Sequence, residues 1–100
     1  MDFNSYLKLM AHKKASDLFI TASLPPSIKI HGRVVPITQT PLSKSQARDL
    51  VIGIMSPSQK EVFERTHECN FAIGVASVGR FRVSAFYQRT AVGMVIRRVE

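Results

Sequence analysis

Alternating polar and apolar residues over Gly79–Arg89 form the clearest pattern in the chain. Arginine, serine and glutamine side chains fall on one face, and the apolar side chains from Phe81 to Tyr87 fall on the other. A period of two residues is typical of a β-strand with one buried and one exposed face. A second run with strand character, Met94–Val99, follows after a short segment that contains Gly93. We therefore expect a short turn that includes Gly93, and antiparallel pairing of the two strands.

The other elements follow from helical or strand periods and from their end signals. Apolar residues at helical spacing predict a helix over residues 2–14, and the capping-box pattern S-x-x-Q predicts helix starts at Ser43 and Ser56. Short apolar runs predict strands at residues 17–21, 27–30, 33–37 and 69–73, with a turn at His31-Gly32 and a loop over residues 74–79. The resulting order is α-β-β-β-α-α-β-β-β.

This order predicts the fold class. Hairpins account for most of the strand pairings, so we expect one α+β domain over residues 1–100, with a mainly antiparallel sheet and helices packed on one side. A chain of 100 residues suits a single domain, and it contains no internal repeat or linker. Because the last predicted strand runs to Glu100, we expect the chain to be part of a longer protein.

The charge is high and unevenly distributed. The formal net charge is +7, and the segment between Cys69 and Val99 contains five arginines and no acidic residue. Such asymmetry favours a nucleic acid, a phosphate group, a membrane surface or an acidic protein as partner. No apolar run approaches the roughly 20 residues of a membrane-spanning helix. The single cysteine cannot form an internal disulfide, which favours a reducing compartment.

The sequence contains no complete catalytic or cofactor-binding motif. Gly74 and Gly79 have the spacing of a phosphate-binding loop, but Arg80 follows where that motif requires lysine. The three histidines and one cysteine have no zinc-site spacing. Ser16 and Asp17 lack a histidine partner, so we expect Asp17 to bond to nearby backbone. We therefore predict that this chain alone is not an enzyme and holds no cofactor or metal.

The arginines of the last hairpin are the candidate functional residues. If Met94 and its alternating neighbours continue the apolar face, Arg97 shares the polar face with Arg80 and Arg82. Facing arginines repel, and an anion between them removes the repulsion, because the planar guanidinium grips phosphate oxygens in pairs. The alternative is a solvated face, or pairing with the acidic residues Glu61, Glu64 and Glu68.

Several segments resemble a known family along the whole chain. They are Ala15–Leu18, Pro25-Pro26, Gly32, Gly79–Val83 and Arg97. Together they resemble the N-terminal domain of the type IV pilus retraction ATPases, the PilT/PilU family of the secretion ATPase superfamily. Phe19 stands where the PilT branch commonly has histidine, Ser84 where asparagine is usual, and residues 67–71 are less acidic. These differences favour the PilU branch.

The resemblance implies a role in a larger motor. It implies a PAS-like domain, joined by a linker to a RecA-like ATPase domain that lies outside this chain, in a cytoplasmic homo-hexamer. Each N-terminal domain is expected to pack on a neighbouring subunit's ATPase domain. Arg82 and Arg97 would then reach that subunit's ATP and Mg²⁺, with Arg80 and Arg98 as weaker candidates for interface contacts or a solvated face.

The resemblance also implies a cellular setting. The full-length parent would be an ATPase for twitching motility, working alongside a PilT-like ATPase and the inner-membrane pilus platform, without inserting into the membrane or binding nucleic acid.

Two alternatives from other classes remain. The segment Gly79–Val83 partly matches the signature of RNA-binding β-platforms, and the basic charge fits RNA. That signature needs its aromatic residues on one strand face, whereas alternation places Phe81 and Phe86 on opposite faces. A PAS-like sensor of small molecules is the other alternative, although no polar constellation in the sequence supports it.

Overall fold

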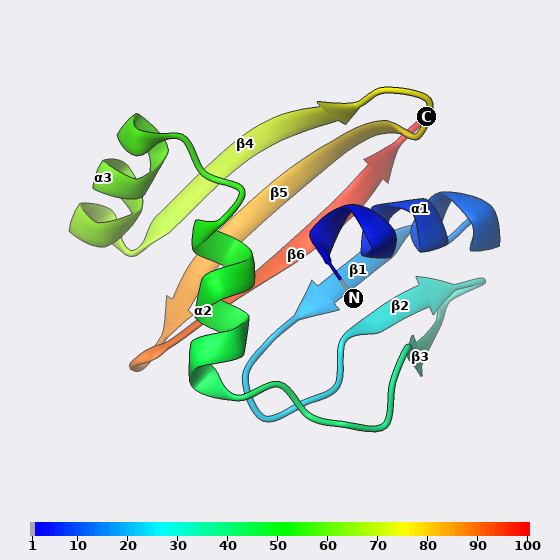
Figure 1. Cartoon of the computed structure of the whole chain (residues 1–100), viewed down its shortest axis with the longest axis horizontal. Helices are drawn as coiled ribbons and strands as arrows, with labels where there is room; N and C mark the ends of the chain where they lie inside the picture. Colours follow the sequence, from blue (N-terminus) through cyan, green and yellow to red (C-terminus); the bar gives the residue numbers. More distant parts are fainter. Residues whose placement is uncertain (1) are drawn as a thin grey trace.

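The computed structural model describes residues 2–100 as three helices and one six-stranded sheet (Figure 1). The helices are α1 (Phe3–Lys13), α2 (Lys44–Ile52) and α3 (Pro57–Thr66). The strands are β1 (Asp17–Ile20), β2 (Ser27–Ile30), β3 (Arg33–Pro36), β4 (Glu68–Val75), β5 (Gly79–Gln88) and β6 (Ala91–Val99). The predicted α+β class and the predicted order of elements are both confirmed.

The sheet joins two three-stranded antiparallel units. Its order is β3-β2-β1-β6-β5-β4, and every neighbouring pair is antiparallel. The first unit is built from consecutive strands near the N-terminus and the second from the last three strands, so the pairing of β1 with β6 connects the two ends of the chain. The helices cover one face of this sheet, as predicted (Figure 1).

The hydrophobic core lies between that face and the helices. At the centre of the sheet, Leu18 of β1 faces Ile96 of β6, and Ile20 faces Met94. All four side chains are fully buried. The helices complete the core with Leu7, Met10, Val51 and Phe63, which are also fully buried.

Capping interactions define the starts of α2 and α3. The backbone N–H of Gln46 donates to Ser43 Oγ at 3.1 Å, and the Ser43 N–H donates to the Gln46 side-chain oxygen at 2.8 Å. Ser56 and Gln59 form the same reciprocal pair. These bonds satisfy backbone donors that the first turn of a helix leaves free, so both capping boxes are confirmed. Within residues 2–100, no helix has both the length and the apolar composition needed to cross a membrane.

The predicted turn at Gly93 is wrong. The chain reverses earlier, at Arg89, whose backbone has a φ of +60°, and Gly93 lies inside β6 opposite Phe86. A Cβ atom at Gly93 would lie 2.9 Å from the carbonyl oxygen of Ile20 and 2.9 Å from the Phe86 ring. The glycine is therefore required by close packing between neighbours and not by a turn.

The strand predicted at residues 69–73 is longer than expected. β4 continues to Val75, which pairs with Gly79 at the start of β5. The predicted loop over residues 74–79 is thereby reduced to three residues, with Ser77 at a φ of +65°. The sequence did not reveal this extension, because Gly74 has no side chain and so interrupts the alternating pattern of polar and apolar residues.

We expect Gly93→Ala to destabilise the fold. Since the added methyl would meet a backbone oxygen that cannot move freely, the free energy of unfolding should fall by about 1–3 kcal/mol. Urea denaturation followed by circular dichroism measures this change. Gly74→Ala is the matched control, because a Cβ atom at that position would have nothing within 4 Å, and its stability should stay near that of the unaltered chain. Equal stability of the Gly93 and Gly74 variants would contradict the packing argument.

Candidate functional site

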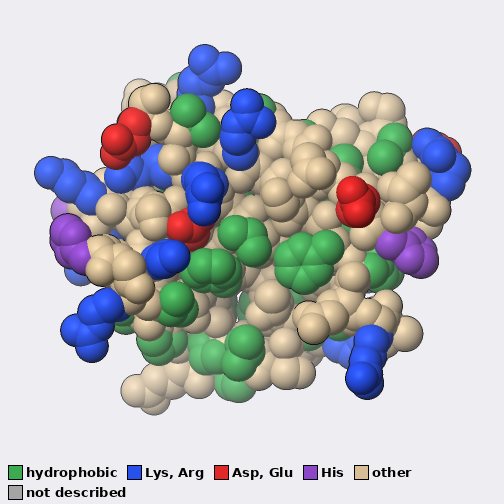
Figure 2. Space-filling view, turned by 180° about the vertical axis from the view of Figure 1, so that it is seen from behind, with side chains coloured by type: hydrophobic (Ala, Val, Ile, Leu, Met, Phe, Trp, Pro, Cys, Tyr) green, Lys and Arg blue, Asp and Glu red, His purple; other side chains and the backbone are tan. Residues whose placement is uncertain are grey.

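The face of the sheet turned away from the helices carries the candidate site. Figure 2 shows this face, with apolar side chains near its centre and basic side chains around them, more of which lie on the left of the view than on the right. The alternating burial of β5 places Arg80 and Arg82 here, because Phe81 and Val83, which alternate with them, are buried on the helix side. This part of the prediction from alternation is confirmed.

The strand register brings Arg82 and Arg97 together. Arg82 of β5 lies directly opposite Arg97 of β6. On the other side of β6, Arg97 lies opposite Asp17 of β1, which in turn lies opposite Lys29 of β2. Residues opposite each other in antiparallel strands project from the same face. A single row of charged residues therefore crosses four strands, with three positive charges and one negative charge.

Asp17 anchors one of the two arginines. Its carboxylate is only 5% exposed, accepts a hydrogen bond from Arg97 Nε at 3.1 Å, and accepts another from Ser16 Oγ at 2.7 Å. The Arg97 side chain is 73% exposed, and among residues 2–100 only Nε of its guanidinium has a partner. The buried carboxylate therefore orients Arg97 and leaves its two terminal nitrogens facing solvent.

This pairing corrects the role expected for Asp17. We expected it to bond to nearby backbone, but its two hydrogen bonds go to side chains, one of them 80 residues away in the sequence. The signal available in the sequence was a charged residue at the start of the apolar run Asp17–Ile20. Alternation along such a run places its first residue on the polar face, but only the pairing of β1 with β6 identifies the partner.

The other two arginines on this face lack protein partners. Among residues 2–100, neither Arg80 nor Arg82 makes a side-chain hydrogen bond or an ion pair. Of the three acidic residues considered as their partners, Glu61 binds Arg65 and Glu64 binds Arg48. Among residues 2–100, the Glu68 side chain forms no ion pair with either arginine. This side of the sheet, with Arg80, Arg82 and Arg97, is called the basic face below. It keeps a surplus of positive charge that an external anion can compensate.

Arg98 is placed differently from the other three candidate arginines, Arg80, Arg82 and Arg97. It lies opposite Phe81, on the helix side of the sheet, and its side chain is only 22% exposed. Its Nε donates to the carbonyl oxygen of Ala15 at 3.0 Å, and its terminal nitrogen lies 3.4 Å from Glu100. These contacts fasten the start of β1 to the end of β6 and leave Arg98 directed away from the basic face.

The arrangement of side chains also bears on two other kinds of site, an RNA-stacking surface and a metal site. Phe81 is fully buried on the helix side, whereas Phe86 lies half-buried on the basic face, so the two rings cannot form one stacking surface. Within the described residues, no three His, Cys, Asp or Glu side chains are grouped closely enough to hold a metal ion. The chemical groups that this face presents are guanidinium groups, which can bind an anion.

A second polar cluster ties two helices to the sheet. Arg48 of α2 donates to Tyr87 Oη of β5 and to Glu64 of α3, both at 2.9 Å, and the Tyr87 hydroxyl donates to Glu64 at 3.1 Å. The Tyr87 ring also packs against Phe63, with ring centres 4.9 Å apart. The hydrogen bond from Arg48 holds the pKa of Glu64 below its usual value. The hydrogen bond to Tyr87, and to a smaller extent the one to Glu64, raises the pKa of Arg48.

Comparison with known proteins gives close relatives along the whole chain. The chain is 58% identical over 100 residues to the type IV pilus ATPase PilU of Pseudomonas aeruginosa and 39% identical over 99 residues to the retraction ATPase PilT of the same organism. The two matches cover 100% and 99% of this chain but only 26% and 29% of the two relatives. No protein-family model matches the chain.

Solved structures show the same fold. The crystal structure of the pilus retraction motor PilT with bound ADP matches the whole chain with a TM-score of 0.90 and 28% identity, over 29% of that structure's length. The Legionella pneumophila ATPase DotB matches 98% of the chain with a TM-score of 0.77 and 22% identity, over 28% of its length. The second match supports the fold alone.

We expect Asp17→Ala to destabilise the sheet around the charged row. The substitution removes the acceptor of Ser16 and Arg97 and leaves the surrounding positive charges without a counter-charge, so the free energy of unfolding should fall by about 1–3 kcal/mol. Denaturation in urea measures the change. Ser16→Ala is the matched control and should cost less, because it leaves the contact between Asp17 and Arg97 in place. Asp17→Ala and Ser16→Ala costing the same would contradict the anchoring role of the ion pair.

The cluster around Glu64 predicts a pH-dependent contribution to stability. Because the pKa of Glu64 is lower in the folded chain than its ordinary value of 4.5, its interactions stabilise the fold above that value. This contribution should disappear as the pH falls through the folded pKa. The difference in unfolding free energy between the unaltered chain and Glu64→Gln should therefore shrink on acidification. Arg48→Met should flatten the pH dependence in the same way, and a full pH dependence in that variant would refute the assignment.

Proposed function

We propose that this chain, a member of the type IV pilus ATPase family that matches the N-terminal part of such a motor, supplies Arg82 and Arg97 to an ATP site on a neighbouring subunit. In this role it is the N-terminal assembly and nucleotide-sensing module. The ATPase domain, with its phosphate-binding loop, is a part of the motor outside this chain. The chain spans about a quarter of the length of the curated relatives, so the activity of the whole protein is part of this proposal.

The facing pair Arg82 and Arg97 is the observation that carries the proposal. The two side chains project from the same face, one oriented by the buried Asp17 and the other without a protein partner among residues 2–100. Arginine binds phosphate oxygens through two parallel hydrogen bonds, and an anion between the pair offsets their repulsion. The chain has no phosphate-binding loop of its own, so we propose that the phosphate is presented by another domain.

ATP with Mg²⁺ is the anion that this proposal names. The PilT structure matched over the whole chain was solved with bound ADP, which supports a nucleotide over other phosphate compounds. Arg97 would contribute its two solvent-facing nitrogens and Arg82 its whole guanidinium. Positive groups that contact a transferring phosphoryl group stabilise the charge of the transition state. Arg80 is assigned a secondary role at the edge of the same site.

The wider setting is inferred from the relatives. We propose a homo-hexameric motor in which each copy of this PAS-like domain packs on the ATPase domain of a neighbour. The 58% identity to PilU favours the PilU branch, with a PilT-like ATPase as a companion motor. The proposed location is the cytoplasmic side of the inner membrane, at the pilus platform.

Removing either arginine should reduce ATP hydrolysis by the full-length parent. We expect Arg82→Ala and Arg97→Ala each to lower kcat sharply, toward the losses of about 10³–10⁵-fold that follow removal of arginine fingers in other nucleotide hydrolases. Steady-state ATP turnover measures the effect, and circular dichroism of the 100-residue chain checks that both variants remain folded.

Arg89→Ala provides the matched control. Arg89 belongs to the same hairpin but lies in its turn, so its removal should leave turnover close to that of the unaltered motor. Near-normal turnover in both the Arg82 and Arg97 variants would exclude these arginines from catalysis.

A further inference from the structure

The two edges of the sheet differ in how they are protected. The outer strand β3 has only four residues, begins with Arg33 and ends with Pro36, and these features discourage pairing with another strand. The other outer strand, β4, has eight residues, and its only charged residue is Glu68 at its start. It contains no proline or lysine. By the usual rules for edge strands, β4 is open to strand addition.

The hydrogen bonds of β4 show which of its backbone groups are free. Tyr87 N–H donates to the His67 carbonyl oxygen at 3.1 Å, so the odd-numbered residues that follow direct their backbone groups toward β5. The even-numbered residues direct theirs outward. The Glu68 carbonyl oxygen already accepts from Thr66 Oγ1 at 3.0 Å. The free edge therefore consists of the N–H and C=O groups of Asn70, Ala72 and Gly74.

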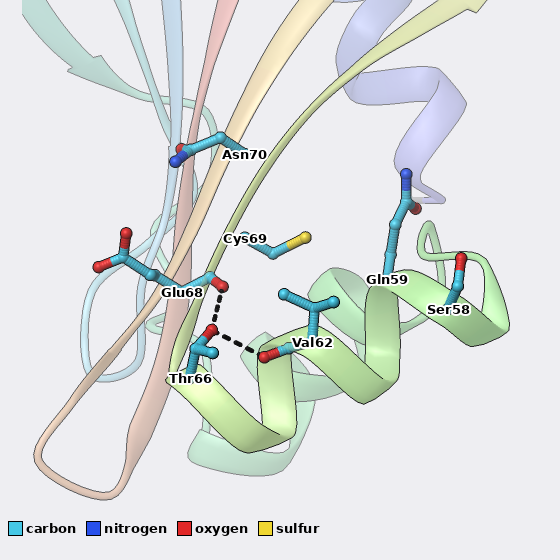
Figure 3. Close-up of a pocket in the computed structure, with 7 residues that line it drawn as sticks. All are labelled: Ser58, Gln59, Val62, Thr66, Glu68, Cys69 and Asn70. Atoms are coloured by element: carbon cyan, nitrogen blue, oxygen red, sulfur yellow. Dashed lines mark hydrogen bonds between the residues drawn. The ribbon is translucent and has the colours of Figure 1, made fainter.

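A groove lies along the first part of this edge (Figure 3). It has a volume of about 720 Å³ and runs between α3 and β4. Figure 3 shows Cys69 directed toward α3, Val62 rising toward the strand, and Asn70 directed to the other face. The groove is lined mainly by polar side chains, with Val62 and Cys69 as its apolar part, and it borders a strand edge, as in domains that bind an extended chain by adding it to a sheet.

We propose that β4 pairs with β4 of a second copy of this chain, antiparallel across a two-fold axis at Ala72. In this register, Ala72 faces its counterpart, and Asn70 faces Gly74 of the second copy. Each of these pairs would exchange both of its main-chain hydrogen bonds. On the helix side, Phe71 faces Ile73 and Cys69 faces Val75. The pairing would therefore carry the β4–β5 turn of each copy to the groove of the other.

The chemistry of the edge favours a second copy as occupant. In the proposed register, the Glu68 side chain lies one step diagonally from Gly74 of the other copy, and Arg80 lies beside that glycine on β5. All three positions are on the basic face. Because Gly74 has no side chain, it leaves space for Glu68 of one copy to reach Arg80 of the other. The two-fold axis repeats this opposite-charge contact, and no like charges face each other along the paired segment.

This contact differs from the one that the proposed motor needs. A two-fold contact uses the same surface on both copies, whereas a ring is built from two different surfaces. Pairing through β4 leaves the basic face in the middle of the sheet uncovered. The two proposals share only Arg80, and the pairing of β4 uses neither Arg82 nor Arg97, so a failure of the pairing would leave the proposed role of Arg82 and Arg97 undecided, and the reverse also holds.

Sedimentation of the 100-residue chain over a concentration series tests the pairing. We expect a reversible monomer–dimer equilibrium with no larger species. Ala72→Lys should raise the dissociation constant about tenfold or more, because it places two like charges directly opposite each other. Val34→Lys is the matched control, since it adds the same charge to the exposed outer strand β3 and should leave the dimer unchanged.

A charge exchange tests the register. Glu68→Arg alone and Arg80→Glu alone should each weaken the dimer, and the double variant should restore it. Circular dichroism establishes that every variant is folded. The proposal is overturned if the chain stays monomeric at every concentration, if it forms open-ended assemblies, or if Val34→Lys weakens association while Ala72→Lys does not. Failure of the double variant to recover overturns the register at Ala72.

Discussion

The antiparallel pairing of β1 with β6 is the contact on which the rest of the structure depends. It joins the first three strands to the last three, and it brings together segments separated by about 80 residues. Its helix side contributes the fully buried residues Leu18, Ile20, Met94 and Ile96 to the core. Each such side chain stabilises the fold by about 1.5–3 kcal/mol relative to exposure to water. Without this pairing, the two three-stranded units would each leave an open inner edge.

The same pairing creates the candidate site on the opposite face. Arg97 stands on β6 between Asp17 of β1 and Arg82 of β5. The buried carboxylate of Asp17 holds the Arg97 guanidinium in place, and the positive charge of Arg82 repels it. An oriented arginine beside a free one is a suitable arrangement for a phosphate group, because less side-chain freedom is lost when the ligand binds. The core and the basic face are therefore two consequences of one strand register.

The sequence allowed prediction of the features that depend on near neighbours. The capping boxes at Ser43 and Ser56 and the alternation along β5 are local patterns, and the structure confirms each of them. Alternation also predicted that Arg82 and Arg97 share a face. Their direct opposition depends on the hairpin register, and predicting a turn at Gly93 would have given the wrong one, because that glycine fits against Phe86 inside the strand. Glycine permits both a turn and a close contact, so its presence alone does not distinguish them.

The partner of Arg97 was beyond the reach of such patterns. Pairing between strands at opposite ends of a chain produces no periodic pattern in either strand. The sequence therefore showed only that a charged residue, Asp17, begins an apolar run. Charge is also distributed unevenly across the strands of the sheet. Positive charge is concentrated in the central rows, where one buried carboxylate partly balances it, while the outer strand β4 carries a single charge at its start. Because net repulsion between copies is smallest where charge is absent, the edge at β4 is where this basic domain can approach another polypeptide most closely.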